Sequence, residues 1–134
     1  MSILDLSNEN FDDVVEPEAV EPGEYQLRIL EVKIDNDKND EPYVMPRFEI
    51  VDQPTAKDFT KFLRIPHKGL DEKKMNNAKL QLKRFAECFG IDLTQSLDVD
   101  DLQGLEGWAL LGLDKNEDSE YGPQNYVKQW ITGA

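Results

Sequence analysis

The chain has 134 residues, enough for one small domain with its own core, and carries a net charge of −13 at pH 7. It contains no apolar run near the roughly 20 residues of a membrane helix and no basic-then-apolar start typical of a secretory signal. One cysteine and one histidine are too few for an internal disulfide or a zinc cluster. We therefore expect a protein of a reducing cytoplasm that uses no metal and no membrane.

The charge is unevenly distributed along the chain. Residues 1–24 contain eight carboxylates and no base, whereas residues 57–84 contain nine bases and only three acids. We call residues 57–84 the basic band. A band of this kind attracts a polyanion even when the molecule as a whole is acidic.

Residues 1–24, "MSILDLSNENFDDVVEPEAVEPGE", are predicted to form a flexible acidic N-terminal arm ahead of a domain at 25–134. Like charges and two prolines oppose folding there. The arm has two interpretations. It serves solubility, or it is a docking peptide for a partner or for the basic band of the same chain. In the second case its apolar anchors are Leu4, Leu6, Phe11, Val14 and Val15.

Three strands are predicted before the main helix, at 25–34, 43–51 and 58–65. In the first strand, the apolar residues occupy odd positions up to Ile29 and even positions from Val32 onward. This change near Leu30 and Glu31 indicates a β-bulge. Pro46 lacks an amide donor, so the second strand is expected to be irregular or at an edge there. In the third, Phe59, Leu63 and Ile65 alternate with Thr60, Phe62 and Arg64, although Lys61 falls in the apolar phase.

A helix of about five turns is predicted after these strands. Asp71 is a good N-cap and Gly90 a natural stop. Its apolar stripe consists of Met75, Ala78, Leu82, Phe85 and Phe89. A short helical turn is expected within 97–107.

Two closing strands are predicted at 108–113 and 125–131. In the second, Tyr126, Lys128 and Trp130 share one face, and Val127 and Ile131 share the other. Three strands, a helix and two strands predict a mostly β protein, a five-stranded OB-fold barrel in the order β-β-β-α-β-β. An open α+β sheet with one helix is the alternative.

The sequence does not predict an enzyme or a cofactor. The eight glycines are scattered and form no phosphate-binding loop. His67 and Cys88 lie in unrelated contexts, and a small buried side chain explains Cys88 better than a nucleophile does. The acidic stretches "DNDKNDE" and "DKNEDSE" lack the spacing of a calcium loop and are interpreted as solvated turns.

Cations alternating with aromatic residues on strands are the remaining signal. Single-stranded nucleic acid requires cations for its phosphates and flat rings for its unpaired bases. Trp108 and Phe48 are expected in the core, while Trp130 and Phe62 are evenly balanced between core and surface. The candidate nucleic-acid-binding residues are Tyr43, Arg47, Lys61, Phe62, Arg64, Lys68, Tyr126, Lys128 and Trp130.

The chain also resembles the phage-encoded single-stranded DNA-binding proteins of OB fold, a family long listed as having unknown function. The matching features are "PGEYQLRILEVKI", "PRFEIVD", "NNAKLQLKRFAECFGI", "GLEGWALLGL" and "NYVKQWI". The resemblance implies sequence-independent binding of single-stranded DNA during phage replication or recombination, in the cytoplasm of a bacterial host. Many single-strand binders end in an acidic tip, but this chain ends in "QWITGA". Any recruitment of replication or recombination proteins would therefore belong to residues 1–24.

Two other functions compete with this one. The first is an acidic protein-interaction module, such as a DNA mimic, in which the basic band is incidental. The second is an accessory structural protein of the phage particle.

Overall fold

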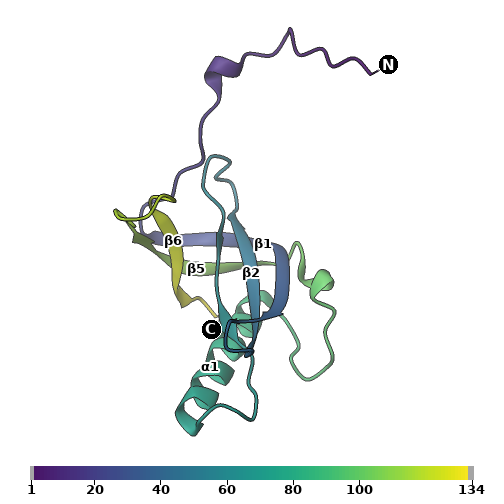
Figure 1. The fold of residues 1–134 in the computed structure, drawn as a ribbon, viewed down its shortest axis with the longest axis vertical. Helices are drawn as coiled ribbons and strands as arrows, with labels where there is room; N and C mark the ends of the chain where they lie inside the picture. The colour runs from purple at the N-terminus through teal and green to yellow at the C-terminus, as the bar shows by residue number, and fades with distance from the viewer. Residues whose placement is uncertain (1, 133–134) are drawn as a thin grey trace.

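The computed structural model describes residues 2–132 (Figure 1). It is mostly β with one main helix, as the sequence predicts. In chain order the elements are η1 (Phe11–Asp13), β1 (Gly23–Asn36), β2 (Pro42–Ile50), β3 (Phe59–Thr60), β4 (Leu63–Arg64), α1 (Glu72–Phe89), η2 (Val99–Leu102), β5 (Glu106–Asp114) and β6 (Gln124–Trp130).

The strands form one antiparallel sheet that curls into a half-barrel, with α1 at one end (Figure 1). The sheet order is β3-β2-β1-β5-β6, and β4 pairs with β2 beyond β3. The edge strands β3 and β6 approach each other without pairing. This arrangement is consistent with an OB-like fold, in which the third and last strands are also neighbours.

The bulge predicted in the first strand is confirmed. Ile29 pairs with Phe48 and Glu31 pairs with Arg47, so Leu30 is the extra residue. A bulge bends its strand and increases the local twist. The long strand β1 can therefore pair with β5 through its first half and with β2 along most of its length.

The third strand is interrupted, where the sequence predicted one continuous strand at 58–65. β3 and β4 pair with β2 in the same register, and the gap between them lies opposite Met45 and Pro46. The amide of Lys61 donates to the carbonyl of Pro46 at 3.1 Å, so position 46 faces this neighbour. Because proline has no N–H, the return hydrogen bond cannot form.

The helix ends as the sequence predicts. The side chain of Asp71 accepts from the amide of Lys74 at 2.8 Å and caps the first turn of α1. Gly90 follows the last turn with φ of 71°, a left-handed conformation that glycine adopts without strain. The predicted short helical turn is η2.

One aromatic cluster fills the space between the sheet and α1. The ring of Phe48 packs against those of Phe59, Phe85, Phe89 and Trp130, with centroids 5.6 to 6.4 Å apart. The core placement predicted for Phe48 is confirmed. The residues of the core cluster are Leu27, Ile29, Phe48, Ile50, Phe59, Leu63, Phe85, Phe89, Leu102, Ala109, Leu111, Val127 and Trp130.

The core placement predicted for Trp108 is wrong. Trp108 is 50% exposed on the outer face of β5. Its neighbours Gly107 and Ala109 point inward, and a Cβ on Gly107 would come within 2.7 Å of the carbonyl oxygen of Cys88. The sheet therefore approaches the end of α1 too closely for a large inward side chain here, and the strand alternation turns Trp108 outward.

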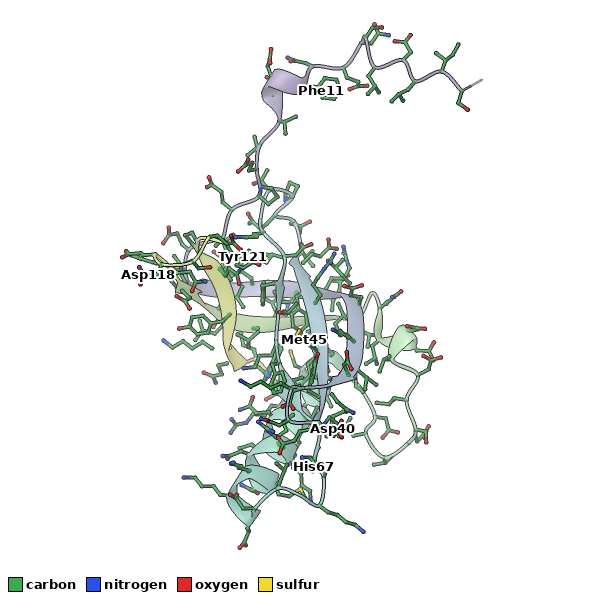
Figure 2. All side chains as sticks on the ribbon, viewed as in Figure 1. Phe11, Asp40, Met45, His67, Asp118 and Tyr121 are labelled. Carbon is green, nitrogen blue, oxygen red and sulfur yellow. The ribbon has the colours of Figure 1, made fainter. Side chains whose placement is uncertain are left out.

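The N-terminal segment leaves the half-barrel at the end opposite α1 (Figure 1). Phe11 lies on this segment away from the sheet (Figure 2), and its side chain is exposed. The other large apolar side chains of the predicted arm, Leu4, Leu6, Val14 and Val15, are exposed as well.

The last part of the predicted arm is attached to the domain. Glu18 hydrogen-bonds through its backbone to residues 55 and 57, at 3.0 and 2.9 Å. The amide of Val20 donates to Oδ1 of the buried Asn125, and Nδ2 of Asn125 donates to the carbonyl of Val20, both at 2.8 Å. β1 then begins at Gly23. The projecting arm therefore comprises residues 2–17 of the predicted residues 1–24.

None of the helices within residues 2–132 combines the length and the apolar composition needed to cross a membrane.

Candidate nucleic-acid interface

An aromatic pair lies on the outer face of the sheet, where Tyr43 of β2 meets Phe62, the residue just before β4. The ring centroids of Tyr43 and Phe62 are 4.9 Å apart, and Phe62 is 42% exposed. Tyr43 pairs with Arg64 across the two strands, and the guanidinium carbon of Arg64 lies 5.9 Å from the Phe62 ring centroid. The predicted alternation brings these three residues together. A cation beside exposed rings is an arrangement that suits an unpaired base and its phosphate.

Carboxylates partly neutralise the two arginines of this face. Arg47 forms ion pairs with Glu31 at 3.3 Å and Asp58 at 3.6 Å, and Arg64 pairs with Glu41. Since these arginines already have anionic partners, a phosphate would have to compete for them. They are weaker candidates for phosphate contacts than the sequence indicated.

A cleft of about 340 Å³ lies between β4 and α1, next to the aromatic pair. We call it the first cleft. Lys61, half-buried in the break between β3 and β4, and Lys74 of α1 supply cations to it. Its lining residues are Lys61, Phe62, Leu63, Arg64, Lys74, Asn77, Ala78 and Gln81.

A second cleft of about 330 Å³ lies between α1 and β6. Arg84 and Lys128 supply its cations. Its lining residues are Gln81, Arg84, Val127, Lys128, Gln129, Trp130 and Thr132. Among residues 2–132, no carboxylate side chain lines either cleft.

The predicted stacking role of Trp130 is not compatible with its position. Leu111 pairs with Val127 and Leu110 pairs with Gln129, so Lys128 is an extra residue in a bulge. The bulge reverses the alternation beyond Lys128. Trp130 therefore turns inward and is only 5% exposed, whereas the sequence placed it on the same face as Tyr126 and Lys128.

Tyr126 is exposed on the outer face of β6. It pairs with Gly112, and a Cβ at position 112 would lie 2.3 Å from Cζ of Tyr126. The tyrosine ring therefore covers the glycine, and one part of the ring is not available to a base. Lys128, in the bulge, is also exposed.

Lys68 lies in the loop that leads into α1, near His67 (Figure 2), and is exposed. It lines neither cleft. The amide of Gly69 donates to Nδ1 of His67 at 3.1 Å, which orders the loop. Of the predicted residues, the structure thus brings together Tyr43, Lys61, Phe62 and Arg64, while Lys68 and Tyr126 lie apart from them.

Four polar residues of α1 that line the clefts were missed by sequence reasoning. They are Lys74, Asn77, Gln81 and Arg84. Their spacing of three, four and three residues forms a polar stripe beside the apolar one, a signal present in the sequence.

The single cysteine, Cys88, lies on α1 and is half-buried against β5. Its thiol donates to the carbonyl of Trp108 at 3.2 Å, and burial raises the pKa of Cys88 to about 11. A thiol with so high a pKa stays protonated at neutral pH and is a poor nucleophile.

No known family model matches this chain, and no curated protein is similar to it at a significant level.

Proposed function

We propose that the protein binds single-stranded DNA without sequence preference, through a barrel of OB type, and serves phage DNA replication or recombination in the cytoplasm of a bacterial host. Exposed aromatic rings would stack on bases, and nearby cations would contact phosphates. The resemblance described for the sequence supports the phage context.

The first cleft carries this proposal. A protein of net charge −13 presents here a cleft lined by the unpaired Lys61 and Lys74, by Arg64, which pairs with Glu41, and by an exposed phenylalanine ring. No carboxylate lines this cleft within the described residues. Tyr43 supports the Phe62 ring from the neighbouring strand. Cations and an exposed ring in one cleft match the two chemical parts of a single strand, the phosphate and the base.

The same cleft favours a single strand over a duplex. In a duplex the faces of the bases are stacked on one another, so the ring of Phe62 has no base to contact. Cations alone would bind the phosphates of single-stranded and duplex DNA similarly. The ring is therefore the part of the site that discriminates between them.

A DNA mimic is less well supported. Such a protein would present its carboxylates on the face that a DNA-binding partner contacts, but the two clefts present cations. The exposed apolar side chains of the arm favour a protein partner for that segment only, such as a replication or recombination protein.

Fluorescence titration with oligo-dT tests the proposal. The wild-type protein should bind, with a log–log salt slope of about −0.7 per neutralised phosphate, and should bind duplex DNA more weakly. Phe62→Ala should weaken binding by about 1–3 kcal/mol, roughly 5- to 150-fold. Trp108→Ala is the control, because it also removes an exposed ring, one that lies outside the first cleft, and should leave affinity unchanged. Equal affinity for duplex DNA, or no binding at low salt, refutes the proposal.

A further inference from the structure

The first and second clefts adjoin each other on α1. Gln81 lines both, with Lys74 and Asn77 on the side of β4 and Arg84 on the side of β6. From Lys74 to Arg84 this stripe rises about 15 Å along the helix axis, at 1.5 Å per residue. The two clefts and the stripe between them therefore form one continuous surface.

Four of the five cations of this surface lack anionic partners, and the fifth, Arg64, pairs with Glu41. Within residues 2–132, Lys61, Lys74, Arg84 and Lys128 form no ion pair. On the far side of the helix, Lys83 pairs with Glu87 at 4.0 Å, whereas Lys79 forms no ion pair within the described residues. The arginines of the outer sheet face are also paired. The two clefts thus offer four unpaired cations close together, whereas the arginines of the outer sheet face are paired.

We infer that the bound single strand does not stay on the sheet face but leaves Phe62, crosses α1 at Gln81 and continues through the second cleft to Lys128. This inference rests on the proposed function and adds a set of contacts from the helix. Lys74 and Arg84 contact phosphates on either side of the crossing. Asn77 and Gln81 offer amide donors and acceptors to bases of any sequence.

The double substitution Lys74→Ala/Arg84→Ala tests this path. It should weaken oligo-dT binding on the order of tenfold at 0.1 M salt. The log–log salt slope should become shallower by about 1.4, the contribution of two phosphates. Both side chains are exposed and form no ion pair, so the melting temperature should not change. Lys74→Gln/Arg84→Gln is the second variant if the first one is unstable.

The matched control is Lys79→Ala/Lys83→Ala. Each of these lysines is two residues from Gln81, about 200° around the helix, so both lie on the opposite side of α1. The control removes the same charge from the same helix and should change affinity less than twofold.

The outcomes separate the path from the proposed function. If the wild-type protein does not bind oligo-dT, both are refuted. If Phe62→Ala weakens binding but Lys74→Ala/Arg84→Ala does not, the function stands and the path across α1 is refuted. Equal losses in the test and control doubles would show a general charge effect and would also refute the path.

Discussion

Substitution of Trp130 tests whether its ring belongs to the core. The indole ring packs against Phe48, Phe85 and Phe89, with ring centroids 5.7, 5.4 and 5.8 Å away and interplanar angles of 62 to 74°. Edge-on aromatic pairs of this kind contribute about 0.5–1.5 kcal/mol each beyond the burial of area. Trp130→Ala removes all three contacts and leaves a cavity between β2 and α1.

The expected loss of stability from Trp130→Ala is about 3–5 kcal/mol. For a domain of this size each kcal/mol lowers the melting temperature by roughly 4 °C, so the shift should be about 10–20 °C. Trp130→Phe is the matched variant. It keeps an aromatic ring and removes the indole Nε1, a buried donor without a hydrogen-bond partner in the described residues. Trp130→Phe should lose less stability than Trp130→Ala does, because it leaves a smaller cavity.

Thermal denaturation followed by circular dichroism measures both variants, and oligo-dT titration is done below their melting temperatures. While it is folded, Trp130→Ala should lose less affinity than Phe62→Ala does. A Trp130→Ala protein that melts like the wild type and loses oligo-dT binding would refute the reasoning, because the ring would then be stacking on bases. Equal destabilisation by alanine and phenylalanine would refute the packing argument.

Two further predictions concern the arm and the cysteine. Deletion of residues 2–16 removes five carboxylates and no base, taking the net charge from −13 to −8, so it should leave the melting temperature unchanged and tighten oligo-dT binding at low salt. Extending the deletion to residue 22 should lower the melting temperature, because Asn125 then loses both hydrogen bonds to Val20; equal melting of the two deletions would contradict the anchoring. The rate of Cys88 alkylation by iodoacetamide should rise with pH, with a midpoint at the thiol pKa of about 11 in the folded protein. In urea the midpoint should fall near 9.0, the ordinary pKa of a cysteine thiol. Because the pKa of Cys88 is higher in the folded state, the protonated thiol stabilises the fold below pH 9, and this stabilisation is lost as the pH rises toward 11. A common midpoint in both states would contradict the burial of the thiol.

The features set by local chemistry could be predicted from the sequence. The helix carries its own signals in Asp71, Gly90 and a regular apolar stripe, and the structure places its ends where these signals fall. The bulge in β1 was also visible, because the apolar phase on its two sides differs by one residue. Each of these features is determined within a short stretch of chain.

The features set by pairing between distant segments could not be predicted. The bulge at Lys128 depends on how β6 pairs with β5, and the hydrophobic pattern around it, with Tyr126, Val127 and Trp130, fits more than one register. Trp108 faces solvent because Gly107 lies against the end of α1, a contact between segments about 20 residues apart. Alternation in the sequence predicts which residues of a strand share a face. Which of the two faces is buried depends on how the strand packs against distant segments.

The candidate site also has some features that local sequence predicts and others that depend on distant pairing. Tyr43 and Arg64 pair across β2 and β4, and Phe62 lies in the break just before β4. The alternation of residues 60, 62 and 64 already placed Phe62 and Arg64 on one face, so their proximity to each other follows from the sequence. The pairing of Arg47 with Glu31 and Asp58 depends on register and on a loop, so the sequence could not show that this cation is already occupied. The stripe of Lys74, Asn77, Gln81 and Arg84 was readable, but solvation is the ordinary explanation for polar residues on a helix. Only the position of α1 between two clefts gives these residues a possible ligand.

Distance and screening explain how so acidic a chain can present a cationic path. At 0.1 M salt the Debye length is about 10 Å, so only carboxylates close to the clefts weaken the attraction of a phosphate. No carboxylate lines the clefts within the described residues, although Glu41 pairs with Arg64 of the first cleft. The arm leaves the half-barrel at the end opposite α1 (Figure 1), where its charge is largely screened from the clefts.

At 0.01 M salt the Debye length grows to about 30 Å, and repulsion from the arm then reaches the site. Deletion of the arm should therefore change affinity strongly at 0.01 M and weakly at 0.1 M. An arm that instead docks in the clefts through Phe11 and its neighbours would compete with DNA at both salt concentrations, because apolar contacts are not screened. The salt dependence of the deletion thus distinguishes repulsion at a distance from occupation of the site.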